Sequence, residues 1–330
     1  MNFKEFIGID VSKSYFDVFI YSKKLHLRFD NTASGFEQMI AWISQQIHCG
    51  SNEVLFGLEH TGLYSVSLSI FLNEHQYTFC MIPGLELKRS LGIRRGKNDK
   101  IDAYAIAEYL YEKREKLKPY VLADQRQLIL KRLLSYRERL VKERAAFKGR
   151  FKEYKSVLNQ QDHLVLFESH QRMLEFQNEE IKKVEAELYR LIKEDEQLSK
   201  QFDLINSIKG VGPQTALLMI VLTRGFTSFT AWRKFASYSG IAPFPHESGT
   251  ITRRKKVSHL ANKRIKALLT CCACTAIQYN PEMKLYYHRR LREGKNEMST
   301  INIIRNKMLA RIFAVVQRGT PYVETYKFAS

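Results

Sequence analysis

The sequence contains no apolar run long enough to cross a lipid bilayer. Its longest apolar stretches, TALLMIVL and ALLTCCACTAI, are much shorter than the roughly 20 residues that a membrane-spanning helix needs. The first residues, MNFKEFIGID, also lack the apolar segment of a secretory signal peptide. We therefore expect neither a membrane anchor nor a secretory leader.

Cysteine is scarce, and its spacing excludes two common uses of the residue. Three of the five cysteines lie together in CCAC, which is neither a disulfide framework nor a pair of CxxC zinc-binding turns. Cys271, Cys272 and Cys274 belong to an apolar run that is typical of a buried helix. We expect small core residues rather than metal ligands, in a reducing, cytoplasmic compartment.

Acidic residues are outnumbered: 53 Lys and Arg stand against 34 Asp and Glu, which gives a formal net charge of +19. An excess of this size indicates a polyanionic partner, and nucleic acid is the first candidate. An anionic membrane surface is the weaker interpretation, because the cations are spread over the whole chain instead of forming one amphipathic helix.

The first 122 residues have the pattern of an α/β domain. Short apolar bursts separated by SKS and SKK predict a three-stranded antiparallel meander over residues 5–30. A helix, a buried strand in EVLFGLE, a second helix, a strand in YTFCMIP and a helix over residues 98–115 follow. This order would suit a ribonuclease-H-like domain if one further short strand follows YTFCMIP.

Residues 123–200 have a different, helical pattern. Apolar residues recur at spacings of three, four and seven among Lys, Arg, Glu and Gln, and SVLNQQDH offers a bend between the two halves. This pattern predicts an antiparallel pair of long helices, either a coiled-coil arm that dimerises or two helices of an ordinary bundle. The apolar positions are Leu130, Leu133, Leu134, Leu140, Val141, Phe147, Phe151, Ile181, Val184, Leu188 and Leu191.

Residues 201–330 form a third, mostly helical region. LINSIKGVGPQTALLMIV predicts two helices joined by a glycine turn. A helix, a loop rich in Pro, Ser and Gly, and more helices to about residue 317 follow. The glycine turn fits a helix-hairpin-helix module that offers backbone N–H groups to phosphate, and it fits a plain helical hairpin equally well.

Four carboxylates form a candidate cation site. Asp10 lies within an apolar strand, where a charge is costly unless it binds something, and Glu59 ends another strand. Asp99 and Asp102 are three residues apart at a helix start and so share one face. They also suit the positive helix end behind an Asn98 cap, which alone would explain the pair. Together the four could bind two Mg²⁺ or Mn²⁺ ions that clamp the oxygens of a phosphodiester.

Basic and polar residues in several motifs are candidate phosphate ligands. GIRRGKN adjoins the acid pair, KGVGP forms the glycine turn, and TRRKKV adds four consecutive cations. Charge runs on a surface are often only solvated, and both interpretations are open here. The candidates are Arg94, Arg95, Lys97, Lys209, Arg253, Arg254, Lys255, Lys256, Asn262 and Lys263.

Several of these motifs resemble one family. FIGIDVSKSYFDVFIY, GLEHTGLY and KNDKIDAYAIAEYL are similar to the N-terminal RuvC-like domain of the DEDD transposases of bacterial insertion sequences, the insertion-sequence 110 family, which includes relatives acting as DNA invertases. INSIKGVGPQTALLMI and FASYSGIAPFPHESGTITRRKKVSHLANKRIKALL resemble the family's C-terminal transposase domain. By this resemblance, Asp10, Glu59, Asp99 and Asp102 match the family's catalytic, metal-binding tetrad.

The resemblance also implies a serine nucleophile in the C-terminal domain. Ser248 is the best match, and Ser258 in KKVSHLANKR is the rival. A serine hydroxyl that attacks phosphorus leaves a covalent phosphoserine link, which conserves the bond for rejoining. The chain departs from the family pattern of Arg-Gly-Asn and Leu-Arg, since it has LAN at 260–262 and IK at 265–266. Lysine cannot grip a phosphate through two parallel hydrogen bonds as arginine does.

The function that the resemblance implies is a DNA transposase and recombinase of a mobile element, in the cytoplasm with the nucleoid. A structured non-coding bridge RNA would pair with donor and target DNA, with Mg²⁺ or Mn²⁺ as cofactor, in a homodimer or tetramer. The metal site of one subunit would be completed by the serine of another. Two alternatives remain: a metal-dependent, structure-specific nuclease of junction-resolvase type, and a non-catalytic nucleic-acid-binding protein.

Overall fold

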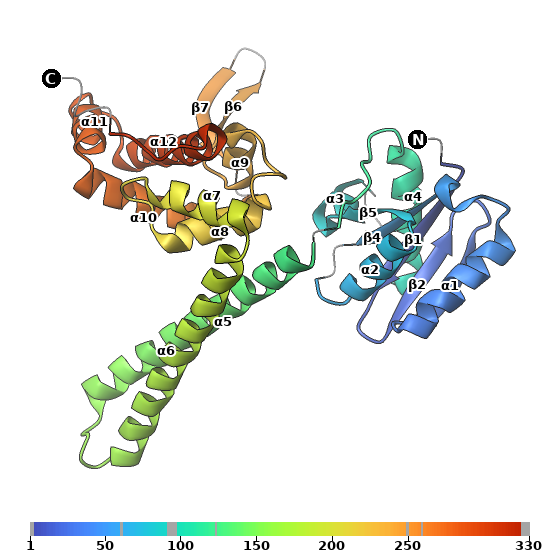
Figure 1. The fold of residues 1–330 in the computed structure, drawn as a ribbon, viewed down its shortest axis with the longest axis horizontal. Helices are drawn as coiled ribbons and strands as arrows, with labels where there is room; N and C mark the ends of the chain where they lie inside the picture. Colours follow the sequence, from blue (N-terminus) through green and yellow to red (C-terminus); the bar gives the residue numbers. More distant parts are fainter. Residues whose placement is uncertain are drawn as a thin grey trace. The chain divides into compact units, whose positions relative to one another are not determined.

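The structure, a computed structural model, describes residues 3–59, 62–90, 98–122, 124–248, 251–258 and 260–324. The chain divides into two compact units, Met1–Leu122 and Ala123–Ser330 (Figure 1). Each is described by itself. None of the described helices combines the length and the apolar content needed to cross a membrane.

The first unit is built on one mixed sheet of five strands in the order β3-β2-β1-β4-β5. The strands are β1 (Glu5–Val11), β2 (Tyr15–Ile20), β3 (Leu25–Asp30), β4 (Val54–Glu59) and β5 (Thr78–Ile82). The first three pair antiparallel, which confirms the predicted meander, whereas β4 and β5 run parallel to β1. The further strand expected after β5 is wrong for the described residues, since the short helix α3 (Gly84–Ser90) begins there instead. Pro83 breaks the strand pairing at this point because it has no N–H to donate.

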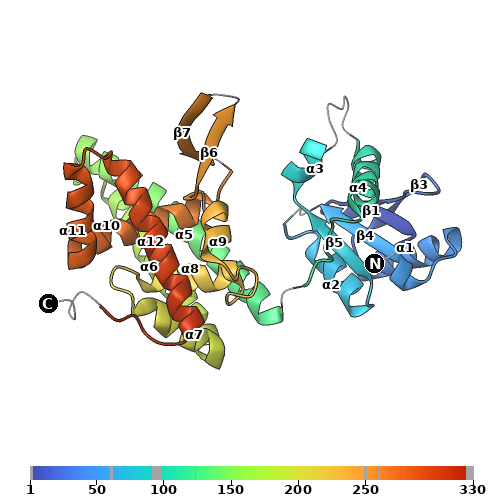
Figure 2. The same ribbon diagram turned by 90° about the horizontal axis from the view of Figure 1, so that it is seen from above.

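Both faces of this sheet are covered by helices. On one face, Ile7, Ile9, Val18 and Phe56 belong to a buried cluster that extends to α1 and α2. The helix α4 lies over β1 and β4 on the other face (Figure 2). The helices of the unit are α1 (Ala33–Gln46), α2 (Val66–Glu74), α3 (Gly84–Ser90) and α4 (Asp99–Lys113), with a 3₁₀ turn at Ser51–Glu53.

Two glycines allow α4 to lie directly on the sheet. Gly8 and Gly57 are partners across the parallel β1–β4 pair. A Cβ atom on Gly8 would stand 2.1 Å from the carbonyl oxygen of Ala103, and one on Gly57 would stand 2.7 Å from Leu110 Cδ1. Any larger residue would push the helix away, so these glycines set the height of α4 above the strands.

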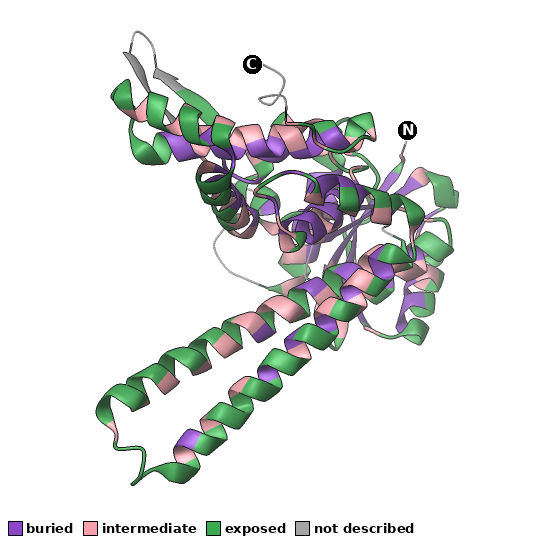
Figure 3. Ribbon diagram, turned by 60° about the vertical axis from the view of Figure 1, so that its left-hand side comes forward, coloured by how far each residue is buried: buried purple, intermediate pink, exposed green. Residues whose placement is uncertain are grey.

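The second unit begins with an antiparallel helical hairpin, α5 (Gln125–Val157) and α6 (Leu164–Lys193). The predicted pair of long helices and the bend between them are thus confirmed. Arg137 Nη2 lies 2.6 Å from Glu185 Oε1, and Arg144 Nη1 lies 2.7 Å from Asn178 Oδ1, as antiparallel pairing requires. Figure 3 shows that most residues toward the tip of the hairpin are exposed.

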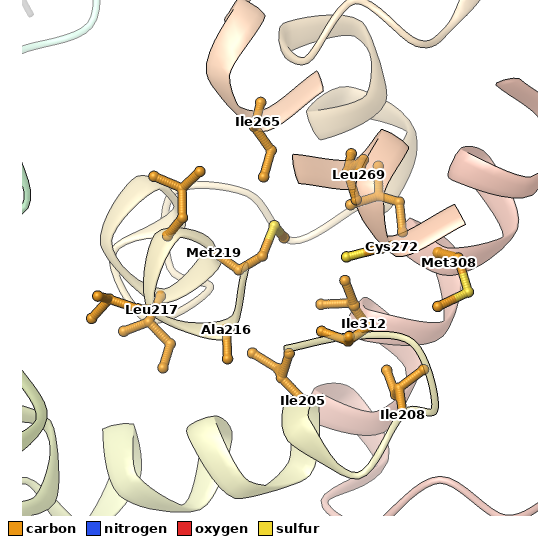
Figure 4. Close-up of a cluster of buried hydrophobic side chains, with 14 of the residues drawn as sticks. Ile205, Ile208, Ala216, Leu217, Met219, Ile265, Leu269, Cys272, Met308 and Ile312 are labelled. Atoms are coloured by element: carbon orange, nitrogen blue, oxygen red, sulfur yellow. The ribbon is translucent and has the colours of Figure 1, made fainter. Parts of the chain in front are cut away.

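The rest of the second unit is mostly helical, as predicted. Its helices are α7 (Glu196–Asn206), α8 (Pro213–Thr223), α9 (Trp232–Tyr238), α10 (Lys263–Tyr279), α11 (Pro281–Arg292) and α12 (Glu297–Arg318). Side chains from α7, α8, α10 and α12 meet in one apolar core, part of which is drawn in Figure 4. Cys272 is buried in that core, but Cys271 and Cys274 are exposed, so the prediction that all three are core residues is wrong for two of them.

One prediction for this unit is wrong at the level of secondary structure. The expected Pro-, Ser- and Gly-rich loop contains an antiparallel hairpin of β6 (Pro243–Ser248) and β7 (Ile251–Val257). The pairing shifts register between Phe244 and His246, at the second proline of β6. A two-stranded sheet consists only of edge strands, and prolines are tolerated there because the missing N–H can face solvent.

Candidate active site

Asp10 is placed by β1 on the face of the sheet that α4 covers. Side chains two residues apart along a strand point to the same face, so Asp10 shares the face of Gly8, against which α4 packs. Directly across the antiparallel pair stands Asp17 of β2. A carboxylate at this position is only partly open to solvent and has a second acid opposite it.

Glu59 is the last residue of β4 and follows Gly57 by two positions, so it faces the same side as Asp10. Its carboxylate fits against Gly84 at the start of α3, where a Cβ atom would lie 2.1 Å from Glu59 Oε1. The glycine therefore keeps the end of β4 open for the acidic side chain. The predicted position of Glu59 at a strand end is confirmed.

Asp99 and Asp102 both lie in the first turn of α4. Asn98 caps this helix, and its side-chain oxygen accepts a hydrogen bond of 3.1 Å from the backbone N–H of Lys100. The capping interpretation is confirmed, and the site interpretation is compatible with it. The partial positive charge of the helix start offsets some of the repulsion among the acids.

The electrostatics of Asp10 show that the four predicted acids lie near one another. Its pKa is raised from 3.8 to about 6, first because burial penalises the charged form and then because of Asp102, Glu59, Asp99 and Asp17, in that order. Because each of these acids disfavours the charge on Asp10, the strand ends and the helix start contribute to one acidic region. Strongly shifted carboxyl groups of this kind concentrate at functional sites.

The acids do not already form a closed cage. In the parts of the chain that the structure describes, no three His, Cys, Asp or Glu side chains are arranged to hold a metal ion. The donor set is nevertheless the one that Mg²⁺ and Mn²⁺ prefer, because all of its ligands are hard carboxylate oxygens. The crowding that raises the Asp10 pKa also fits a divalent cation, which would relieve it.

Sequence reasoning missed a fifth acid and its partners. Asp17 is only 1% exposed and is held by two residues of β3, namely His26 and Arg28. The signal was present, since Asp17 interrupts the apolar strand YFDVFI just as Asp10 interrupts FIGIDV. Arg28 also contacts Asp99, which ties the β3 edge to the acidic region.

Comparison with known proteins assigns the chain to a family. Residues 7–160 match the DEDD model of the IS110 transposases, described as Transposase, and residues 202–288 match the model described as Transposase IS116/IS110/IS902 family. The chain belongs to the IS110 family of transposases. The two matched segments cover the strands and helix that carry the acids and most of the helical second unit.

Relatives of this IS110-family chain include two gene-inverting proteins and a protein of an insertion element. The pilin gene-inverting proteins of Moraxella lacunata and Moraxella bovis are each 25% identical to it over 330 residues, which covers 97% of this chain and 98% of the relative. The insertion element IS110 uncharacterized 43.6 kDa protein of Streptomyces coelicolor is 28% identical over 119 residues, 36% of this chain and 29% of that protein. The IS110 assignment places the chain among transposases and DNA invertases, enzymes that act on DNA.

The two serines of the C-terminal region differ in their surroundings. Ser248 is the last residue of β6, and its backbone pairs with Ile251 across the hairpin, while its side chain lies outside the described residues. Ser258 follows β7, and its Oγ accepts a hydrogen bond of 3.1 Å from the backbone N–H of Leu260. The hydroxyl of Ser258 therefore already helps to fix a local turn.

The predicted phosphate ligands are found in several settings. Arg94, Arg95 and Lys97 lie outside the described residues. Lys209 Nζ lies 3.6 Å from Glu324 Oε1, and Lys263 is exposed at the start of α10.

The other five predicted ligands lie in β7 or shortly after it. The run 253–256 is in β7, with its side chains outside the described residues. Asn262 caps α10 by accepting from the backbone N–H groups of Arg264 and Ile265, and it donates to the Tyr238 hydroxyl. Asn262 thus has a capping role of its own.

Proposed function

We propose that this IS110-family chain is the recombinase of a mobile element, which cuts and rejoins donor and target DNA. The observation that carries the proposal is the raised pKa of Asp10, to which Glu59, Asp99 and Asp102 all contribute. It supports an arrangement in which the four acids lie on one face of the sheet. The strand order β3-β2-β1-β4-β5, with α4 across one face, supports a RuvC-like, ribonuclease-H-like domain over residues 1–122. If the acids lay on opposite faces, no shared cation site would be possible.

The four acids would hold Mg²⁺ or Mn²⁺. A divalent cation at such a site polarises the phosphodiester and stabilises the oxygens that carry charge in the transition state. The contribution of the chain is to fix the carboxylates on rigid elements, two on adjacent parallel strands and two on the helix packed above them. The approach of α4 to Gly8 keeps the helix start over the strand ends.

Ser248 would be the nucleophile of the reaction. Its oxygen attacks a backbone phosphorus, a Ser–O–P bond forms, and the bond from phosphorus to one deoxyribose oxygen breaks. The serine proton ends on the released hydroxyl, and the reverse reaction with another strand end rejoins the DNA without an external energy source. The position of Ser248 at the end of β6, in the same hairpin as the cationic run 253–256 of β7, supports this role. Ser258 is the weaker choice, because its oxygen is engaged by the Leu260 N–H.

A structured non-coding guide RNA is the expected second partner. The net charge of +19 favours polyanionic partners, and many exposed Lys and Arg residues of α5 contribute to it. Guide-directed recognition needs phosphate-binding surfaces instead of base-reading side chains. Residues 201–330 would form the C-terminal transposase domain. The α5–α6 hairpin, within residues 123–200, would be the coiled-coil arm through which subunits form a dimer or tetramer.

The test is covalent trapping of DNA by the full-length protein. Labelled DNA from the ends of the element is incubated with the adjoining transcript and Mg²⁺, and protein–DNA adducts are separated under denaturing conditions. We expect an adduct that EDTA abolishes, that Ser248→Ala and Asp10→Asn each remove, and that Ser258→Ala leaves in place. DNA cleavage retained by Ser248→Ala would refute the serine mechanism and favour the structure-specific nuclease.

A mixing experiment tests whether the site is shared between subunits. Asp102→Asn chains lack one acid, and Ser248→Ala chains lack the nucleophile. If one subunit supplies the acids and another the serine, mixed oligomers regain part of the activity that each variant lacks alone. Absence of any rescue in verified mixed oligomers would contradict the shared site.

A further inference from the structure

Arg28 lies between a buried acid and one of the four predicted cation ligands. Its Nη2 donates to Asp17 Oδ2 at 2.9 Å and also to Asp99 Oδ2 at 2.9 Å. Its Nε lies 3.2 and 3.1 Å from the two oxygens of Asp17. One guanidinium therefore neutralises the buried carboxylate and engages the exposed one at the same time.

Arg28 is expected to keep its ion pair with Asp17, because an unpaired carboxylate is costly in a buried position. Asp17 is 1% exposed, stands opposite Asp10, and would be a buried, uncompensated charge without its partners. Arg28 is its cross-strand partner in β3. The Tyr15 ring stacks on the guanidinium at 3.9 Å, which further fixes its plane.

The contact with Asp99 is of another kind. The Asp99 side chain is 41% exposed, that of Arg28 is 47% exposed, and the Tyr15 hydroxyl is 3.4 Å from the same Asp99 oxygen. If Arg28 releases Asp99, it keeps all of its contacts with Asp17. The Arg28–Asp99 pair is therefore exchangeable, whereas the Arg28–Asp17 pair is not.

We propose that Arg28 competes with a divalent cation for Asp99. This inference rests on the proposed cation site. With the Arg28 contact made, the other three predicted ligands, Asp10, Glu59 and Asp102, would hold a first cation, and Asp99 is withheld from it. A second cation binds when Asp99 leaves Arg28. Arg28 is thus a positioning residue, an internal counter-ion that acts on the site through Asp99.

The expected size of the effect follows from the exposure of the pair. A partly exposed ion pair changes an equilibrium constant by up to about fivefold. Removing the competitor should therefore tighten the weaker cation-binding step by roughly three- to fivefold. Removing Arg28 alone would leave the buried Asp17 with only its contact to His26, so the double variant Asp17→Asn/Arg28→Gln is the right change. It removes one charge of each sign, so the net charge of the site stays the same.

The experiment is a Mn²⁺ titration of the full-length protein, with free Mn²⁺ measured by electron paramagnetic resonance. We compare wild type with Asp17→Asn/Arg28→Gln, with Asp99→Asn, and with the triple variant. Thermal melting checks that each variant is folded. Lys4→Gln/Glu53→Gln is the matched control, since it removes an ion pair near the other end of β1 without touching the acids. We expect the gain only in the Asp17/Arg28 variant, and none when Asp99→Asn is added to it.

Three results would overturn the inference. Unchanged or weaker Mn²⁺ binding in the Asp17/Arg28 variant would mean that Arg28 does not compete. A gain that persists after Asp99→Asn would mean that it does not act through Asp99. Absence of Mn²⁺ binding in wild type would refute the proposed cation site itself, and the inference with it. Should the double variant not fold, Arg28→Lys should show the same gain in Mn²⁺ affinity. The single ammonium group of lysine cannot bridge Asp17 and Asp99 as the planar guanidinium group does.

Discussion

Replacing Asp10 with asparagine should stabilise the metal-free protein at neutral pH. In the folded chain, burial and the surrounding acids raise the pKa of Asp10 from 3.8 to about 6, so its ionised form is disfavoured there relative to the unfolded chain. A shift of about two units corresponds to ~3 kcal/mol. Because the side chain is partly exposed and solvent screens the repulsion, we expect about 1–2 kcal/mol from Asp10→Asn.

The pH dependence of this stability gain distinguishes the ionisation of Asp10 from other effects of the substitution. Below the ordinary pKa of an aspartic acid, Asp10 is protonated in both the folded and the unfolded chain, and it brings no penalty. As the pH rises from about 4 to about 6, the unfolded chain ionises first, so the wild type loses stability through this window. The advantage of Asp10→Asn should therefore be small near pH 4 and complete at pH 8.

The measurement is urea unfolding in EDTA at both pH values. In a Trp232→Phe background, the remaining tryptophan, Trp42, reports the first unit alone, since it packs on Phe29 there. Glu37→Gln is the control, because it removes one exposed negative charge from the same unit. The reasoning fails if Asp10→Asn is no more stable than wild type at pH 8, or if it gains equally at both pH values.

Two further predictions concern packing and exposure. Gly8→Ala should lower the free energy of unfolding by at least about 2 kcal/mol, because its Cβ would collide with the α4 backbone, which has little room to move. Gly149→Ala, at an open position inside α5, should raise the free energy of unfolding by about 0.5–1 kcal/mol. If urea unfolding gave the same change for Gly8→Ala and Gly149→Ala, the close packing of α4 on Gly8 would be contradicted. Ellman's reagent should modify exposed Cys271 and Cys274 in the folded protein at pH 8. It should spare Cys80, whose pKa burial raises to about 11, and prompt labelling of Cys80 would show that the β5 face is open.

Local patterns in the sequence account for much of the first unit. The meander could be predicted because alternating apolar residues and turn-prone serines and lysines act within a few positions. Asp10 could be predicted because a charge in a buried strand is conspicuous. The role of Asp17 could not, since it depends on which residue of β3 stands across from it and on Asp99, 71 positions beyond Arg28. Such contacts are set by register and by helix packing, which a local pattern does not contain.

The errors in the second unit have similar physical causes. Proline and glycine normally punctuate loops, but β6 accepts its prolines because it pairs on one side only. The cysteine prediction treated an apolar run as buried on every side. Ile265, Leu269, Cys272 and Ala276 recur at helical spacing and form the buried face of α10. This spacing predicts Cys272 in the core and Cys271 and Cys274 outside it.

The packing of the first unit and its acidic region have one structural origin. In both β1 and β4, a glycine precedes the acid by two positions, so the strand that receives α4 also presents a carboxylate beside the helix start. Close packing of the helix therefore brings Asp102 toward Asp10 whether or not a cation is present. The resulting repulsion lowers the stability of the metal-free fold, and a bound cation would remove it. A cation would then gain the most binding free energy where the fold has confined like charges. Asp99, the predicted ligand that Arg28 already contacts, would bind its cation most weakly.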